Sequence, residues 1–171
     1  MIHIGNGVSK YMSEKSRIIF AKCYMLSRIG YGLPLYCGAT EETKNKIHTI
    51  IMKVSRWARR SYCFRESVDS ICRSIKIDRP SEAILKSTAI FAHDLLSKRK
   101  PKQILRTVRT PRSRNKARVS LKYKHLSSKF ERNVIHQAIK VYNENIPDHM
   151  KTLNTKEFRK DIKKIKYIRK A

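Results

Sequence analysis

Apolar residues recur at helical spacing through most of this chain, and that spacing constrains the fold more than any other feature. The clearest helix is expected to follow Thr40, which can serve as its N-cap, with Glu41 and Glu42 at the positive end of the helix dipole. Its apolar side chains share one face: Ile47, Ile50, Ile51, Val54, Trp57 and Ala58. Only five Gly and five Pro occur in 171 residues, so long helices are favoured over a β-sandwich or barrel.

Capping signals indicate where the other helices begin. Ser13 and Glu14 mark the beginning of a first helix, which Gly30 and Gly32 are expected to interrupt. A short helix is expected over residues 68–75. The remaining helix starts are marked by Asp78 with Pro80 and Glu82, by a capping box of Ser128 and Glu131, and by Asn154 with Glu157. A turn that contains Pro147 separates the last two helices.

The sequence therefore predicts an all-α fold, an irregular bundle of about five or six helices. Residues 101–127 interrupt the helical pattern, because they are basic, contain Pro101 and Pro111 and show weak apolar periodicity. We interpret this segment as a basic loop or linker that could become ordered on binding a ligand. It divides the chain into a larger N-terminal helical region, residues 1–100, and a smaller C-terminal helical pair, residues 128–171.

Positive charge is the second dominant feature of the chain. Forty Lys and Arg residues face thirteen Asp and Glu residues, which gives a formal net charge of +27. From Lys98 to Arg118 there are ten basic residues and no acidic one. A compact domain with this charge repels itself, so we expect a polyanionic partner, and nucleic acid is the first candidate. RNA, DNA and their hybrid all qualify, because neutralising phosphates releases condensed counterions in each case.

Three basic clusters are the candidate binding residues. They lie on the second helix (Lys53, Arg56, Arg59, Arg60), in the basic stretch (Lys98, Arg99, Lys100, Arg106, Arg109, Arg112, Arg114, Lys116, Arg118) and on the last helix (Lys160, Lys163, Lys164). Their contacts with phosphates would position the nucleic acid without reading its sequence. Tyr123 lies between Lys122 and Lys124 and could stack on an unpaired base. The competing interpretations are ordinary packing for this tyrosine and a solvent-exposed surface for the Lys and Arg residues.

No catalytic residue and no metal site are expected. Two-metal phosphoryl transfer needs acidic residues that converge on Mg²⁺, whereas the acids here are scattered and mostly explained by helix beginnings. The four cysteines lack the spacing of a zinc module, and Gly5 with Gly7 is only a fragment of a dinucleotide-binding motif. We therefore expect no cofactor and no small-molecule substrate.

The apolar segments are too short to predict a membrane partner. No apolar run approaches the ~20 residues that a membrane span needs. The cysteines are interpreted as free, buried thiols, which fit a reducing compartment. The expected location is intracellular, either nuclear or cytoplasmic.

Two stretches of the sequence, taken together, resemble one known family. The first comprises R-I-G-Y-G-L-P-L-Y-C-G-A at Arg28 to Ala39 and K-I-H-T-I-I-M-K-V-S-R-W-A at Lys46 to Ala58. It resembles the segment just past the polymerase core of non-LTR (LINE-type) retrotransposon reverse transcriptases, where the thumb begins. The second comprises V-Y-N-E-N-I-P-D-H-M-K at Val141 to Lys151 and F-R-K-D-I-K at Phe158 to Lys163. It resembles the W-N-x-L-P-x-x-I-K and F-K-x-x-L-K endings of the same polyproteins, with Tyr142 where the family usually has Trp.

This resemblance implies a helical thumb and post-thumb region that grips template RNA and the primer duplex during target-primed reverse transcription. The thumb-like part corresponds to residues 1–100. The family is an RNA-directed DNA polymerase, but this sequence holds no Y/F-x-D-D motif, so no catalytic residue can be carried over. The chain alone is expected to lack enzymatic activity, and a polypeptide with a catalytic palm and fingers could be its partner.

Two alternatives remain open from the sequence. The chain could be a decayed remnant or an interaction module whose basic residues no longer serve a ligand. It could also be a basic structural protein of the ribosomal or chromatin type. Both alternatives predict only generic binding of polyanions, without preference for one nucleic acid.

Overall fold

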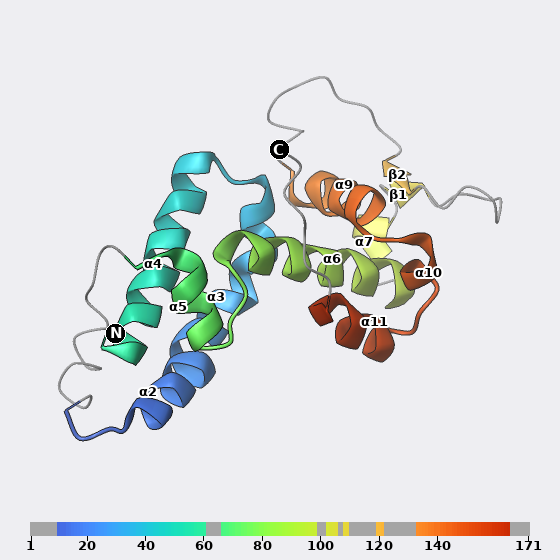
Figure 1. Cartoon of the computed structure of the whole chain (residues 1–171). Coiled ribbons are helices and arrows are strands. Elements are labelled where there is room, and N and C mark those ends of the chain that lie inside the picture. Colours follow the sequence, from blue (N-terminus) through green and yellow to red (C-terminus); the bar gives the residue numbers. More distant parts are fainter. Residues whose placement is uncertain are drawn as a thin grey trace. The chain divides into compact units, whose positions relative to one another are not determined.

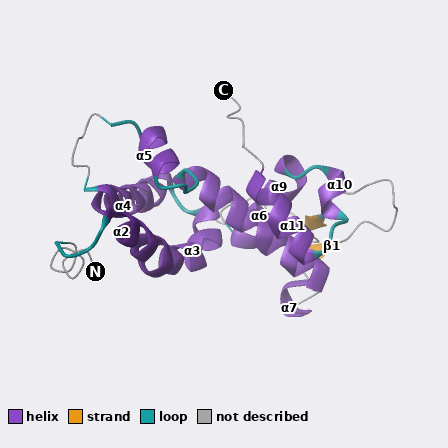
Figure 2. Ribbon diagram, turned by 60° about the horizontal axis from the view of Figure 1, so that its bottom comes forward, coloured by secondary structure: helices purple, strands orange, loops and turns teal. Residues whose placement is uncertain are grey.

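The computed structural model describes residues 10–60, 66–98, 102–105, 108–109, 119–121 and 133–164 (Figure 1). These residues are mostly helical, which confirms the all-α prediction (Figure 2). The chain divides into two compact units: unit 1 comprises Met1–Gly32 and Thr40–Ala83, and unit 2 comprises Leu33–Ala39 and Ile84–Ala171. The division expected at residues 101–127 stays a prediction, because most of that segment lies outside the described residues.

The first helices that the structure describes in unit 1 form one continuous run of three parts. These are α2 (Glu14–Phe20), the π-helix η1 (Ala21–Leu26) and α3 (Ser27–Gly32). The Oγ of Ser13 accepts a hydrogen bond from the main-chain N–H of Ser16, which confirms the predicted helix start. The run continues through Gly30, so the interruption expected there is wrong, and α3 ends at Gly32.

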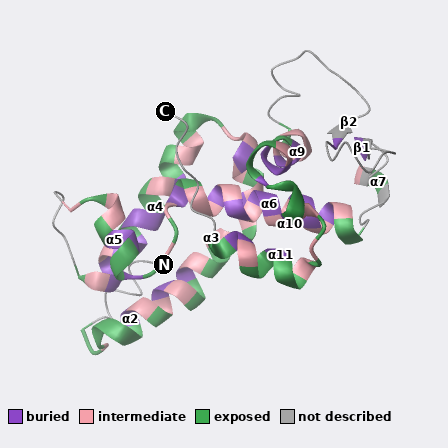
Figure 3. Cartoon of the chain, turned by 45° about the vertical axis from the view of Figure 1, so that its right-hand side comes forward, coloured by how far each residue is buried: buried purple, intermediate pink, exposed green. Residues whose placement is uncertain are grey.

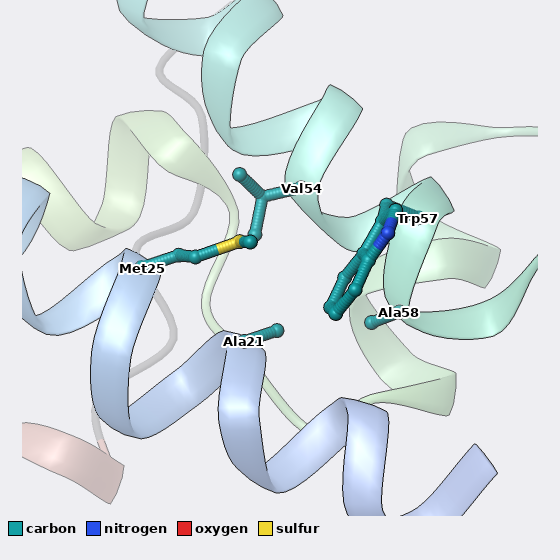
Figure 4. Packing of buried hydrophobic residues seen from close by; sticks show 5 residues of the cluster. All are labelled: Ala21, Met25, Val54, Trp57 and Ala58. Atoms are coloured by element: carbon teal, nitrogen blue, oxygen red, sulfur yellow. The ribbon is translucent and has the colours of Figure 1, made fainter. Parts of the chain in front are cut away.

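The longest helix wholly within unit 1 is α4 (Glu41–Arg59), and it begins as predicted. The Oγ1 of Thr40 accepts a hydrogen bond from the main-chain N–H of Thr43. Its C-terminal half packs against η1 in a cluster of buried residues shown in Figure 4: Ala21, Met25, Val54, Trp57 and Ala58. Ile50 was expected on this face but is 47% exposed, because it lies at the margin of the apolar stripe, whereas Ile47 and Ile51 are buried.

A second cluster joins the middle of α4 to α5 (Val68–Ser74). Met52 packs there with Ile71 and Cys72, and Val68 and Ile77 lie at its edge. The position of α5 confirms the short helix expected over residues 68–75. The next helix, α6 (Pro80–Lys98), begins at Pro80 as predicted and continues from unit 1 into unit 2. Figure 3 shows buried residues in purple at intervals along α4 and α6.

Within the described residues, the other helices belong to unit 2. They are the 3₁₀ helix η2 (Leu33–Gly38), α7 (Lys102–Leu105), α9 (Val134–Asn145), α10 (Asp148–Lys151), α11 (Thr155–Asp161) and the 3₁₀ helix η3 (Ile162–Lys164). The Oδ1 of Asn154 accepts hydrogen bonds from the main-chain N–H groups of Lys156 and Glu157, which confirms the predicted start of the last helix. The fully buried Phe158 and Ile162 follow on its inner side.

The helix that carries Val134 begins later than predicted. Its N-cap is Asn133, whose side chain accepts from the main-chain N–H of Ile135. The capping box expected from Ser128 and Glu131 is therefore not the cap of α9, and both residues lie outside the described part. Several capping residues compete within a few positions here, and the sequence alone ranks them poorly.

The basic segment 101–127 is more ordered than a plain loop in its described part. Besides α7, it contains the strands β1 (Val108–Arg109) and β2 (Ser120–Leu121). These strands pair antiparallel, with Val108 opposite Leu121 and Arg109 opposite Ser120. The prediction of a basic loop or linker did not include these short elements.

Candidate nucleic-acid interface

The basic residues of α4 separate into two groups along the helix. Near its beginning, Lys44 pairs with Glu41 at 2.8 Å and Lys46 pairs with Glu42 at 2.6 Å. Beyond this point α4 carries no further acidic residue. Its positive charge therefore gathers toward the C-terminal end, where the helix dipole also favours cations.

Lys53 and Arg60 are the exposed members of the cluster predicted on this helix. They lie seven positions apart and therefore share one helix face. Arg60 follows the last residue of α4 and has a left-handed backbone, with φ 54°. Its main-chain N–H donates to the carbonyls of Arg56 and Trp57. The backbone thus ends the helix at Arg60, at the basic end of α4.

Arg59 and Arg56 are less accessible than the sequence suggested. Nη1 of Arg59 donates to Oε1 of Glu66 at 2.5 Å, and both residues are half-buried. The same carboxylate oxygen accepts from the hydroxyl of Ser70 in α5 at 3.1 Å. Arg59 therefore links the end of α4 to the start of α5, and Arg56 is half-buried.

The last helix presents a second basic surface, on unit 2. Lys160, Lys163 and Lys164 are all exposed, as expected for a binding surface. Lys164 donates to Asp161 at 2.9 Å, and this hydrogen bond lowers the pKa of the Asp161 carboxyl. Lys163 contributes structurally through its main chain, because its carbonyl accepts from the buried Lys86 at 3.4 Å.

Lys98, at the end of α6, pairs with Asp94, which also pairs with a second basic residue. Its Nζ lies 3.3 Å from Oδ2 of Asp94, and Nη2 of Arg159 in α11 lies 2.5 Å from the same oxygen. The carboxylate thus ties α11 to α6. Its single charge is divided between two cations, so this site retains a net positive charge.

The paired strands β1 and β2 lie within the basic segment 101–127 and pack against α9. Val108 and Val119 form a buried cluster with Ile139 of α9, and Leu96 and Ile135 pack against it. In the sequence, β1 and β2 stand on either side of residues 110–118, which lie outside the described part. By sequence this segment holds Arg112, Arg114, Lys116 and Arg118.

Asn143 of α9 fixes the returning strand. Its Oδ1 accepts from the main-chain N–H of Val119 at 3.2 Å, and its Nδ2 donates to the Val119 carbonyl at 2.7 Å. The side chain thus satisfies both main-chain groups of one residue. The sequence analysis did not anticipate this role, although Asn143 belongs to one of the quoted motifs.

Half of the predicted site lies outside the described residues. This applies to Arg99, Lys100, Arg106, Arg112, Arg114, Lys116, Arg118 and Tyr123. For Arg109 the structure gives the main chain, in β1, and not the side chain. The structure instead draws attention to two exposed tyrosines that the sequence analysis did not select, Tyr24 and Tyr31. Their signal in the sequence is weak: they lie at i and i+7, with Arg28 at i+4.

The described residues give little sign of a metal site or a membrane-spanning helix. Within it, no group of three or more His, Cys, Asp or Glu side chains could hold a metal ion, and no helix is long and apolar enough to cross a membrane. Cys37 and Cys72 are buried, as expected, and burial raises the pKa of the Cys72 thiol. Cys23 is free but exposed, which differs from the expectation.

Comparison of the chain with protein-family models, with curated proteins and with solved structures finds no match. The resemblance to LINE-type reverse transcriptases therefore rests on the sequence motifs quoted above. It enters the functional account as a proposal.

Proposed function

We propose that this chain is a nucleic-acid-binding region of a non-LTR retrotransposon reverse transcriptase, without a catalytic palm of its own. Its ligand is RNA or an RNA–DNA hybrid, held mainly through phosphates. A separate polypeptide with a palm and fingers would supply any polymerase chemistry. The proposal requires an intracellular location, nuclear or cytoplasmic.

The observation that carries this proposal is the use of acidic residues in the fold. Seven acids form ion pairs with bases of the same chain: Glu41, Glu42, Glu66, Asp69, Asp94, Asp148 and Asp161. Even if each of the thirteen acidic residues paired with one basic residue, 27 of the forty basic residues would have no acidic partner (40 − 13 = 27). An excess of this size supports a permanent polyanionic ligand, because it otherwise only destabilises the compact state.

Arg60 gives a second, independent support. A left-handed C-cap strongly favours glycine, and a side chain there costs about 1 kcal/mol. Arg60 nevertheless occupies this position, exposed, at the basic end of α4. Lys76 has the same left-handed backbone, so the exposure of Arg60 at the basic end of α4, near Lys53, supports a binding role rather than the strain alone.

The proposal is tested by comparing two double variants with equal loss of charge. Lys53→Gln with Arg60→Gly removes two predicted phosphate contacts and relieves the strain at Arg60. The control, Lys46→Gln with Lys76→Gly, removes one base that is paired with Glu42 and another exposed base with a left-handed backbone, φ 53°. The readout is fluorescence anisotropy with an RNA–DNA hybrid at several salt concentrations.

We expect the Lys53/Arg60 variant to bind more weakly and to lose up to about 2 units of the slope of log K against log salt, close to 0.9 for each phosphate on a duplex. The control should keep the wild-type slope within about half a unit. Equal losses from both variants would contradict a defined surface on α4. That outcome would favour the alternative of generic polyanion binding.

A further inference from the structure

One face of the run from η1 to α3 presents two tyrosines and an arginine to solvent. Tyr24, Arg28 and Tyr31 lie at i, i+4 and i+7, so they follow one side of the helical run. All three are exposed, and Tyr31 is 94% exposed. None of the residues of α3 is buried. The face is therefore open along its whole length.

The N-terminal end of this face packs against the core of unit 1. The ring of Tyr24 stacks on Phe20 with centroids 5.2 Å apart, and Phe20 in turn contacts Trp57 at 5.9 Å. The guanidinium carbon of Arg28 lies 4.7 Å from the centroid of the Tyr24 ring. Phe20, Tyr24 and Arg28 thus form a column of flat groups that begins at the core and leads toward Tyr31.

The surroundings of Tyr31 are open and free of negative charge in the sequence. A Cβ atom added at Gly30 would have no neighbour within 4 Å. From Lys15 to Thr40 the sequence contains no acidic residue. The face therefore combines aromatic surface with positive charge, which complements a phosphate backbone and its bases.

We propose that Arg28 and Tyr31 form a stacking surface for unpaired bases of single-stranded nucleic acid, and that Tyr24, which packs between Phe20 and Arg28, holds the Arg28 guanidinium in place. The proposal rests on the proposed function, because it assumes that the chain binds nucleic acid at all. Every base has a π-face, so aromatic stacking holds single strands with little sequence preference. The planar guanidinium of Arg28 can stack on a base or hold a phosphate.

The dimensions of this face agree with a short single strand. The three positions from Arg28 to Tyr31 span roughly 4.5 Å of α-helix. Nucleotides rise by about 3.4 Å in a stacked strand, so this part of the face matches one or two of them. A protein helix is a less suitable occupant, because it would need a continuous apolar stripe, and here a cation lies between the two rings.

The decisive variant is Tyr31→Leu, which removes the ring and keeps an apolar side chain of similar reach. Its control is Tyr11→Leu, because Tyr11 is 90% exposed in the same unit and precedes α2, on the order of 30 Å along the helical run from Tyr31. Each protein is titrated with a single-stranded RNA that carries one 2-aminopurine and with a fully paired hybrid.

Stacking predicts that Tyr31→Leu binds the single strand roughly ten-fold more weakly and no longer quenches the 2-aminopurine fluorescence. The hybrid affinity and the salt slope should not change, since the substitution removes no charge. Tyr11→Leu should behave as the wild type. Unchanged quenching and affinity for the single strand in Tyr31→Leu would overturn the proposal.

Cys23 gives a second measurement that needs no substitution. This exposed thiol precedes Tyr24 in the π-helix. Saturating single-stranded RNA should slow its alkylation several-fold, as followed by peptide mass spectrometry, whereas the paired hybrid should slow it less. Equal protection by both ligands would contradict a single-strand site. Salt-dependent hybrid binding together with wild-type affinity of Tyr31→Leu for the single strand would refute this inference alone, and absence of all nucleic-acid binding would refute the proposed function as well.

Discussion

Nε of Arg17 donates a hydrogen bond to the main-chain carbonyl of Ala58 at 3.1 Å, which joins α2 to the C-terminal end of α4. Nη1 of the same guanidinium donates to the carbonyl of Met12 at 2.7 Å. Arg17 is only 5% exposed, so its charge is stabilised by carbonyls, including one at the negative end of a helix dipole. This base therefore serves the fold of unit 1 and is not available to a ligand.

Substitution of Arg17 by Met should lower the free energy of unfolding of unit 1 by about 2 kcal/mol, because it removes hydrogen bonds from a charged donor to buried carbonyls. The measurement is urea denaturation followed by the fluorescence of Trp57, the single tryptophan of the chain. Lys15→Met on the same helix is the control, since Lys15 is exposed. Equal stability of the two variants would contradict the structural role of Arg17.

In unit 2 a buried histidine connects α6 to the C-terminal helices. The ring of His93 stacks on Phe158 with centroids 4.0 Å apart and planes 12° from parallel. Nε2 lies 3.1 Å from the carbonyl oxygen of Leu153, so the proton belongs on Nε2, and Nδ1 can accept from the hydroxyl of Ser97 at 3.3 Å. Burial lowers the pKa of His93 below its ordinary value of 6.5.

This lowered pKa makes unit 2 sensitive to acid. The unfolded chain binds a proton at His93 at higher pH than the folded chain does, so stability is full above about pH 6.5 and falls as the pH drops below it. The loss approaches about 1.4 kcal/mol per pH unit between the two pKa values. Thermal unfolding by circular dichroism from pH 7.5 to 5 should show a smaller loss in His93→Gln than in the wild type.

An NMR titration of the wild type checks the same point without a substitution. The His93 imidazole should titrate below pH 6.5. A His93 that titrates at or above this value while the protein remains folded would show that the ring is not held neutral by burial.

The Asn143 contact predicts a local effect at the base of the basic stretch. Asn143→Ala leaves both main-chain groups of the buried Val119 without this partner, which should cost about 2 kcal/mol of local stability. Hydrogen exchange at residues 119–121 should accelerate on the order of 30-fold. Asn145→Ala, at an exposed position two residues later, is the control. An unchanged exchange rate in Asn143→Ala would show that β1 and β2 remain paired without the two hydrogen bonds from Asn143.

Gly30 offers a stabilising substitution. It lies within α3 and its backbone does not need a positive φ, while a Cβ there meets no atom within 4 Å. Gly30→Ala should therefore raise the free energy of unfolding by about 0.5–1 kcal/mol, mainly by restricting the unfolded chain. The urea titration with Trp57 fluorescence measures it. A loss of stability would mean that the helix does not continue through this position.

Local signals in the sequence predicted much of the fold. Ser13, Thr40 and Asn154 all cap the helices expected of them, because a cap depends on residues only a few positions away. The failures have local causes too: Ile50 lies at the margin of its stripe, and Asn133 rather than Ser128 begins α9. The contacts of Arg17 with Ala58 and of Asn143 with Val119 could not be predicted, because they join residues 41 and 24 positions apart.

The candidate site was predicted less completely than the fold. Charge alone selected Arg59 together with Lys53, and only the structure separates a base paired with Glu66 from an exposed one. Exposure also separates two of the thiols. Cys23 is exposed and Cys37 is buried, and the residues around them in the sequence do not predict this difference. The exposed aromatic face at Tyr24 and Tyr31 was overlooked, because aromatic residues at helical spacing are usually part of a core, and only the structure shows that these two are exposed.

The central claim is that the excess charge serves a nucleic acid rather than any polyanion. The most direct test is a side-by-side anisotropy titration of the wild-type protein with an RNA–DNA hybrid and with heparin as competitor, at matched charge and at several salt concentrations. The account predicts that the hybrid binds at least ten-fold more tightly than heparin at moderate salt, and that this preference persists as salt rises. Equal affinity for both ligands at every salt concentration would contradict it.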